Sequence, residues 1–307
     1  MKLRIPKAHR LLRRAFLLTC LLTWQVSAAG AAPLSFNTAL PVSEGEFVFR
    51  EQFIFSGSGH DPGTASRNLQ VFSAVSVLGY GLHNKLAVFG ALPYRDKSLE
   101  ITKNGVHQVR STSGLGDFTV FGRYTVIQID GPGRTFRVAP LAGVELPTGE
   151  NDATDALGRL PQMVQAGSGS TNPFGGIVAT FQSLDFEVDA QINHKANTSV
   201  NGFDAGDVSR LDGSFQYRLW PGSLETPVPG FLYGVLEGNL IHQGRNRNNG
   251  IRDPDTGGTT LFLLPGFLFV TSRWILEGGL QVPVIQDLNG TALEKGLIGR
   301  FGFRINF

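Results

Sequence analysis

The chain has 307 residues, of which 39 are glycine, 23 are phenylalanine and 17% are charged, and its mean hydropathy is zero. This composition excludes a disordered chain, which would carry more charge and fewer aromatic residues. It also excludes a helical membrane protein with several spans, because apolar runs near ~20 residues are confined to the N-terminal region. The high glycine and phenylalanine contents favour a single large all-β domain.

Residues 1–32 are predicted to be a cleaved secretory signal peptide. Basic residues precede an apolar run from Ala15 to Val26, and a stretch of small residues follows. These small residues allow cleavage after Ala29, Ala31 or Ala32, and Ala32 is preferred. General secretion is favoured over twin-arginine export despite the Arg13-Arg14 pair, because a membrane barrel must cross the inner membrane unfolded.

The signal peptide accounts for the basic character of the whole chain. It contains six of the 27 basic residues and none of the 25 acidic ones, so the mature chain has 21 basic residues and a net charge of −4. No nucleic-acid partner is therefore inferred. It also contains the only cysteine, Cys20, whose position inside the apolar run argues against lipid attachment and leaves no disulfide in the mature chain.

Residues 33–307 are predicted to form one domain, a transmembrane antiparallel β-barrel of about twelve strands. The segment 185–195 shows the pattern most clearly, since apolar and polar residues alternate along it with a period of two. Such strands place one face in each of two environments. Segments of this kind, long enough to cross a bilayer at a tilt, occur at 45–56, 69–80, 85–94, 116–127, 135–146, 174–182, 185–195, 208–219, 231–242, 259–270, 273–284 and 296–307.

The connections between these segments alternate in length, as they do in outer-membrane barrels with long extracellular loops and short periplasmic turns. This alternation predicts that both termini are periplasmic. Two of the expected short turns, Gln128 to Arg134 and Trp220 to Gly230, are longer than the pattern requires. The long connections, which we interpret as solvated loops, are 57–68, 95–115, 147–173, 196–207, 243–258 and 285–295.

A secreted β-sandwich is the soluble alternative, and the C-terminus argues against it. Phe301, Phe303, Ile305 and Phe307 place apolar residues at every second position up to the last residue. This resembles the C-terminal signature of bacterial outer-membrane proteins that the barrel-assembly machinery recognises. An apolar edge strand would promote aggregation of a soluble protein, whereas a closed barrel pairs it with the first strand.

Two short motifs in the middle of the chain carry a family resemblance. Gly114-Leu115-Gly116-Asp117 leads into one strand, and Leu146-Pro147-Thr148-Gly149 ends the next, before a loop that contains Gly167-Ser168-Gly169-Ser170. In order and spacing the mature chain resembles the transporters of the MetA pathway of phenol degradation. This resemblance implies an outer-membrane channel for the uptake of small aromatic or hydrophobic molecules, and it implies no catalytic residues.

Charged residues on the polar phase of the strands are expected to line the lumen, because a charge facing lipid near the bilayer centre costs about 2–4 kcal/mol. A conducting path and a salt-bridged, closed interior explain this pattern equally well. In a ring of twelve the seventh strand lies opposite the first, which predicts a transverse field between its acidic residues and Arg50, Arg300 and Arg304. The predicted lumen residues are Arg50, Asp117, Arg123, Arg137, Glu145, Asp185, Glu187, Asp189, Arg210, Asp212, Arg218, Glu237, Glu277, Arg300 and Arg304.

Three segments leave alternatives open. Glu51 shares the phase of the phenylalanines around it, which indicates a bulge in the first strand or an error in the assigned phase. The loop 147–173 contains apolar residues that fold into the lumen or cap the barrel. The segment Pro33 to Ser43 is expected to be a disordered terminus rather than a part of the lumen.

The sequence indicates a passive channel more than an enzyme. His194 and His242 occupy outward positions near strand ends, the pattern of a catalytic histidine beside a serine is missing, and no metal site or cofactor is expected. Asp253 and Asp255 are interpreted as part of a turn rather than as ligands of a calcium ion. A lipid-modifying barrel enzyme and a structural or adhesive barrel remain as alternatives. The expected partners are outer-membrane lipid, the barrel-assembly machinery and a small hydrophobic or aromatic solute, and the oligomeric state is left open.

Overall fold

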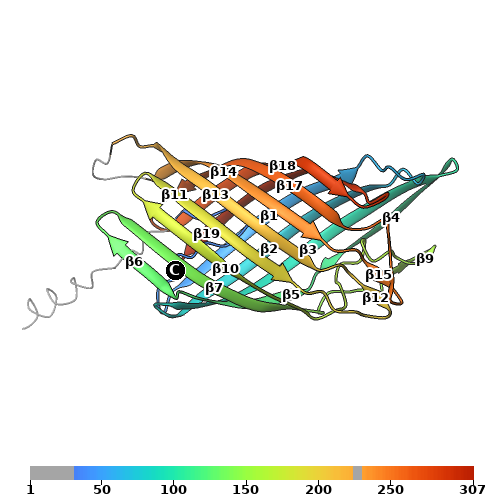
Figure 1. Ribbon diagram of the computed structural model, residues 1–307, viewed down its shortest axis with the longest axis horizontal. Helices are drawn as coiled ribbons and strands as arrows, with labels where there is room; N and C mark the ends of the chain where they lie inside the picture. Colours follow the sequence, from blue (N-terminus) through green and yellow to red (C-terminus); the bar gives the residue numbers. More distant parts are fainter. Residues whose placement is uncertain (1–30, 224–229) are drawn as a thin grey trace, which may run out of the picture.

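The computed structural model describes residues 31–223 and 230–307, which form a closed antiparallel β-barrel of twelve strands. Figure 1 shows the strands inclined to the long axis of the barrel. The fold prediction is confirmed, and the strands lie within four residues of the predicted segments except for β3, which extends past its segment to Lys103. In ring order they are β1 (Phe47–Gly59), β2 (Asn68–His83), β3 (Leu86–Lys103), β5 (Phe118–Tyr124), β7 (Arg134–Leu146), β10 (Asn172–Ser183), β11 (Phe186–Lys195), β13 (Val208–Trp220), β14 (Phe231–Gln243), β17 (Gly258–Val270), β18 (Trp274–Leu288) and β19 (Glu294–Asn306).

The ring closes where the first and last strands meet. β1 pairs with β19 on one side and with β2 on the other, and β7 pairs with β10 to complete the circle. At the end of this seam Phe47 and Phe307 exchange backbone hydrogen bonds of 2.7 and 3.0 Å. Every barrel strand therefore has a partner on both sides, which satisfies the backbone groups that lipid could not.

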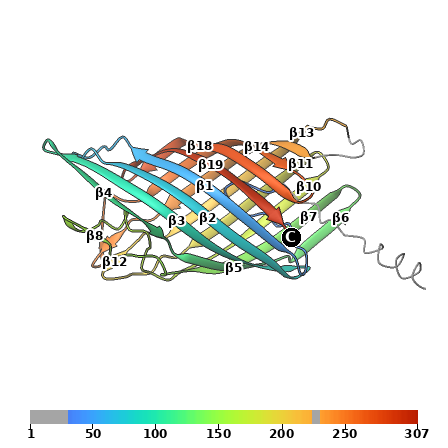
Figure 2. The same cartoon turned by 180° about the vertical axis from the view of Figure 1, so that it is seen from behind.

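The two ends of the barrel differ. One end carries the C-terminus and β6 (Ile127–Gly131), and the other carries the outer tip of β3 with the short strands of the long connections (Figures 1 and 2). We call these the turn end and the loop end. The short strands at the loop end are β8 (Thr154–Asp155), β9 (Gly158–Arg159), β12 (Phe203–Asp204), β15 (Arg247–Asn248) and β16 (Ile251–Arg252).

Two predicted connections are largely strand. β3 continues through residue 103, turns at Asn104 and Gly105, which both have positive φ, and returns as β4 (Val106–Leu115). The prediction of a solvated loop over 95–115 was therefore wrong, because a polar hairpin beyond the membrane lacks the apolar phase that marks the other strands. The long turn 128–134 is likewise a hairpin, in which β6 pairs with the start of β7. Within the connection Trp220 to Gly230, residues 224–229 lie outside the described residues.

The outer surface is apolar over the middle of the barrel. Phe301, Ile305 and Phe307 of the predicted assembly signal are 40–65% exposed on this surface, and Phe303 lies 6.1 Å from Phe49 between ring centroids. Glu51 is also on the outer face, where its carboxylate accepts a 2.6 Å hydrogen bond from Ser76 Oγ. The pairing of β1 with β2 is continuous through Glu51, so neither explanation offered for its phase is correct.

Among the described residues no helix is long and apolar enough to cross a membrane.

Candidate channel lumen

The lumen contains a chain segment that precedes the first strand. Residues 31–43, which we call the N-terminal plug, enter at the turn end, and Leu34 and Ala39 are fully buried. Gly81 makes the entry possible, because a Cβ at this position would lie 2.0 Å from the carbonyl oxygen of Ser43. The expectation of a disordered terminus was wrong, since the strand pattern gives no information about an irregular segment that the lumen encloses.

Glu237 of β14 binds the plug on one side of the lumen. Its carboxylate accepts hydrogen bonds from the backbone N–H groups of Leu34 and Ser35 and from the hydroxyl of Ser35. The side chain of Glu237 is completely buried. A buried carboxylate needs such donors, because an uncompensated charge in a low-dielectric interior is strongly unfavourable.

Basic and amide side chains bind the same part of the plug from the β1–β19 seam. Arg50 Nη2 and Gln52 Nε2 donate to the carbonyl oxygen of Leu34 at 2.6 and 2.8 Å, and Arg304 Nη2 donates to that of Pro33 at 2.9 Å. Glu277 of β18 forms ion pairs with Arg50 at 2.6 Å and with Arg304 at 2.7 Å. Much of the positive charge at the seam is therefore compensated locally, and the transverse field stays a prediction.

The other half of the plug contacts the opposite wall. Thr180 Oγ1 of β10 accepts a 2.8 Å hydrogen bond from the backbone N–H of Ala39, and Asn37 Nδ2 donates to Gln191 Oε1 of β11 at 3.2 Å. Arg123 of β5 donates to the carbonyl oxygen of Leu40. Since these partners lie on strands all around the ring, the plug spans the lumen.

Apolar contacts complete the seat of the plug. Ala31 and Leu34 belong to a buried cluster with Leu264, Leu268 and Ile275, so the inward face is apolar toward the turn end on this side. Ala39 belongs to a second cluster on the wall formed by β7 and β10. Burial of a leucine such as Leu34 contributes on the order of 1.5–3 kcal/mol, which adds to the hydrogen bonds in holding the plug.

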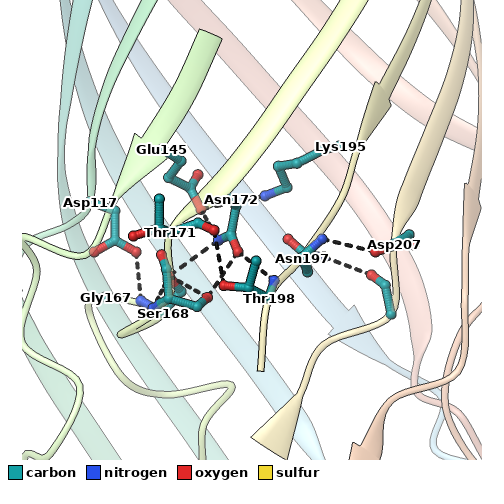
Figure 3. Close-up of polar contacts among 12 residues, drawn as sticks. Asp117, Glu145, Gly167, Ser168, Thr171, Asn172, Lys195, Asn197, Thr198 and Asp207 are labelled. Carbon is teal, nitrogen blue, oxygen red and sulfur yellow. Dashed lines mark hydrogen bonds and ion pairs between the residues drawn. The ribbon is translucent and has the colours of Figure 1, made fainter. Parts of the chain in front are cut away.

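The family motifs meet at the loop end of the lumen (Figure 3). Asp117 Oδ1 accepts a 3.0 Å hydrogen bond from Gly149 N, and its Oδ2 accepts a 2.6 Å hydrogen bond from Ser168 N. Gly149 and Gly167 approach so closely that a Cβ on Gly167 would lie 2.4 Å from Gly149 O. One buried carboxylate therefore fixes both ends of the loop 147–173, and the glycines allow its backbone strands to touch.

The middle of this loop folds against the extended part of β3. Leu160 and Val164 are buried against Leu99, while Lys97 Nζ donates to the carbonyl oxygen of Gln165 at 2.6 Å. Met163, which is 39% exposed, lies on the wall of a cavity in the lumen. The loop therefore packs over the loop end of the barrel, as a cap would, and only Met163 of its apolar residues reaches this cavity.

A second polar group ties the neighbouring loop to the barrel (Figure 3). Asn172 Nδ2 donates to Glu145 Oε1 at 2.9 Å, and Lys195 Nζ lies 3.5 Å from the same oxygen. Thr198 N donates to Asn172 Oδ1 at 3.0 Å, and Asn197 N donates to Asp207 Oδ1 at 2.8 Å. The loops after β7 and β11 thus form one connected structure around the opening.

The remaining predicted lumen residues are spread over the length of the barrel. Glu187 and Asp189 of β11 are buried, and Asp212 forms a 2.9 Å ion pair with Arg210. Arg137 lies 3.6 Å from Asp130 on β6. Asp185 is in the turn before β11, exposed at the turn end, where it pairs with Arg218.

Two cavities lie in the lumen, one toward each end. The loop-end cavity is about 440 Å³ in volume, and the turn-end cavity, beside the plug, is about 320 Å³. A layer of amide side chains and Arg300 lies at the level between them: Gln281 Nε2 donates to Asn239 Oδ1 at 2.8 Å, and Arg300 Nη1 donates to Gln52 Oε1 at 3.3 Å. Reasoning from charge alone missed Gln52, Thr180, Gln191, Asn239 and Gln281, although their strand phase identifies them.

The histidines form part of a polar row on the outer surface. His194 Nδ1 and Ser209 Oγ are 2.9 Å apart, as are His242 Nδ1 and Thr259 Oγ1, and Ser209 pairs with His242 across β13 and β14. The four residues therefore lie at one height near the loop end, as an interfacial band would. In the described part of the chain no three His, Cys, Asp or Glu residues are grouped as metal ligands, and Asp253 Oδ1 accepts a hydrogen bond from Asp255 N within its turn.

The closed ring of twelve strands around a polar lumen defines the protein as an outer-membrane-type β-barrel. The family of the MetA pathway of phenol degradation matches residues 50–277, and the chain belongs to this family. No protein with a curated description matches the sequence.

Solved structures share the fold at low sequence identity. An outer-membrane channel from Pseudomonas putida F1 is 12% identical, with a TM-score of 0.68 over 91% of this chain and 100% of the other. The β domain of the Bordetella autotransporter BrkA is 10% identical, with a TM-score of 0.49 over 86% and 100% of the two chains. The monoaromatic hydrocarbon channel CymD is 11% identical, with a TM-score of 0.40 over 86% and 89%. Only the first similarity is close enough to support the fold.

Proposed function

We propose that the protein is a passive outer-membrane channel for small apolar or aromatic molecules. The observation that carries this proposal is the lumen itself, in which two cavities flank a plug that the barrel wall holds by hydrogen bonds and apolar contacts. Because the wall holds the plug only by such non-covalent contacts, the plug can leave the lumen without the breaking of a covalent bond. The family to which the chain belongs is described by a pathway of phenol degradation, and this supports the proposal that the solute is aromatic.

The test is single-channel conductance of the refolded mature protein in a planar lipid bilayer, with phenol and toluene added to either side. Discrete conductance steps with solute-dependent block are expected. A barrel that migrates as a folded species in gel electrophoresis but gives no steps under any applied voltage would contradict the channel. Under that outcome, hydrolysis of phospholipid micelles would test the lipid-modifying alternative, with Ser209→Ala as the control for the His194–Ser209 pair.

We further propose that the signal peptide is cleaved after Ala29. Ala31 and Ala32 are 3% and 5% exposed, and Ala32 supplies a carbonyl oxygen to Arg304 at 3.2 Å, so both residues are integrated in the plug. This replaces the preferred cleavage after Ala32, and the residues before 31 lie outside the described part of the chain. The intact mass of protein purified from outer membranes distinguishes a mature chain that begins at Gly30 from one that begins at Pro33.

The C-terminal residues Phe301, Phe303, Ile305 and Phe307 are proposed as the signal for the barrel-assembly machinery. Their side chains alternate outward along β19, the strand that closes the ring. Replacing Phe307 by alanine should lower the amount of folded protein in the outer membrane, while Phe267→Ala, an outward change on another strand, should lower it less. Equal yields of the two variants would exclude a special role of the C-terminal residue.

A further inference from the structure

The loop-end cavity has an extensive apolar wall. This wall is formed by side chains from five strands and the last loop, Leu69, Ile241, Phe262, Leu288, Leu293 and Ile298, together with Met163 of the loop 147–173. At about 440 Å³ the cavity lies within the range of small-molecule sites, ~300–1,000 Å³. An apolar wall of this size accepts many small molecules, so the polar groups of the cavity determine which of them it prefers.

Two cations on this wall have no carboxylate partner. In the described part of the chain, Lys295 Nζ forms no hydrogen bond or ion pair, and Arg300 donates only to the amide oxygens of Gln281 and Gln52. Neither cation belongs to an ion pair within 4.0 Å, whereas Glu237 and Glu277 below Arg300 are bound to the plug and the seam. The wall therefore carries uncompensated positive charge.

The other two cations on the wall are already paired with carboxylates. Arg67 forms a 2.6 Å ion pair with Asp61, and Arg210 forms a 2.9 Å ion pair with Asp212. Asp255 is the one carboxylate that lines this cavity among the described residues, and its Oδ1 accepts a 2.8 Å hydrogen bond from Thr291 N. Asp255 offsets one of the two charges of Lys295 and Arg300, so the wall keeps a net positive charge.

A β-bulge turns Lys295 toward the cavity. Ser56 pairs with Ile298, but Ser58 pairs with Lys295, so β19 has one more residue than β1 across this interval. Without the bulge Lys295 would share the outward phase of Leu297 and Phe301. Bulges commonly redirect a side chain in this way, and here the ammonium group of Lys295 lies on the same face of β19 as Arg300 and lines the same cavity.

We propose that the loop-end cavity binds small monocarboxylates with an apolar aromatic or alicyclic body, and this proposal rests on the channel function. The carboxylate would lie between Lys295 and Arg300, and the ring would cover the apolar wall. A neutral arene would make the apolar contacts alone, and a small anion without a ring would make the ionic contacts alone. Only a molecule with both parts satisfies the whole wall.

Calorimetry on the refolded mature protein in detergent tests the site, with benzoate, benzamide and acetate as probes. Benzoate should bind about ten-fold more tightly than benzamide, which lacks the charge, and about ten-fold more tightly than acetate, which lacks the ring. Lys295→Gln should weaken benzoate about ten-fold and leave benzamide unchanged. Lys295→Arg should retain benzoate binding. Lys103→Gln, which removes the same charge from the exposed β3–β4 hairpin, should have no effect.

Equal affinities for benzoate and benzamide in the unaltered protein would overturn the proposal without any variant. It would also fail if Lys295→Gln bound benzoate as tightly as Lys103→Gln does. Bilayer recordings separate this failure from that of the channel: conductance steps without benzoate block contradict the site, whereas benzoate binding without steps contradicts the channel.

Discussion

The carboxylate of Glu237 accepts a hydrogen bond from the backbone N–H of Leu34, which lies 203 residues away in the sequence. This contact joins the N-terminal plug to β14, which is separated in the ring by β17, β18 and β19 from β1, the strand that follows the plug. The N-terminal plug is thus bound to the lumen wall through side-chain hydrogen bonds, although it takes no part in the hydrogen bonds between the barrel strands. Several measurable properties depend on this arrangement.

Weakening the seat of the plug should increase conductance. Glu237→Ala removes the acceptor of both Leu34 N and Ser35 N, and deletion of residues 34–42 removes the plug itself. We expect single-channel conductance to rise about two-fold or more in both variants, because the lumen of a twelve-strand barrel is intermediate in width between a filled barrel and an open porin. Glu51→Ala, a glutamate on the outer face, is the control. Unchanged conductance after the deletion would show that the constriction lies elsewhere.

Asp117 should determine how firmly the loop 147–173 is held. Asp117→Asn keeps one acceptor oxygen but places an amide nitrogen near Ser168 N or Gly149 N, so one of two backbone hydrogen bonds is lost. The expected loss is about 1.5–3 kcal/mol in the free energy of loop opening. Trypsin cleavage at the exposed Arg159 reports this opening. Asp152→Asn, an exposed change in the same loop, should leave the cleavage rate unaltered.

Gly167 should tolerate no side chain. A Cβ there would lie within 2.7 Å of the O, C and Cα atoms of Gly149, all of them backbone, so the loop must move to admit alanine. We expect Gly167→Ala to accelerate trypsin cleavage at Arg159 at least as much as Asp117→Asn does. In contrast, Gly57→Ala places its Cβ in open space and should have no effect. A Gly167→Ala variant with native cleavage would contradict the close approach described here.

The first loop should remain ordered to unusually low pH. The hydrogen bond from the Arg67 guanidinium holds the pKa of Asp61 well below its ordinary value of 3.8. A lowered pKa contributes stability that is present above the unfolded-state value and is lost as the pH falls through the folded-state value. The protection of Gly63 and Arg67 against amide hydrogen exchange, relative to the intrinsic rate at each pH, should therefore persist at pH 4 and be lost only below it. In the Asp61→Asn variant these amides should exchange rapidly at pH 4 as well as below it. Unchanged exchange in this variant would refute the role of the Asp61–Arg67 ion pair.

The strands could be predicted from the sequence because each one separates lipid from a polar lumen and so repeats with a period of two. Glu237 and Glu277 were assigned to the lumen by this phase alone. Features that break the period of two could not be predicted from the sequence. The plug contains no strand, and Lys295 faces inward only because of the bulge opposite Gly57. Asp117 was found as part of a motif, but its contact with Gly149 and Ser168 depends on a loop that returns to its own beginning.

The seam between β1 and β19 also imposes an order on assembly. The plug is joined to the start of β1 at the turn end, where Gly45 N donates to Gly81 O at 2.9 Å, while the strand that closes the ring is made last. The wall that receives Leu34 does not exist until β14, β17 and β18 have paired in turn up to that strand. The plug, which precedes every strand in the sequence, therefore reaches its final position only after the strands that follow it have formed their wall.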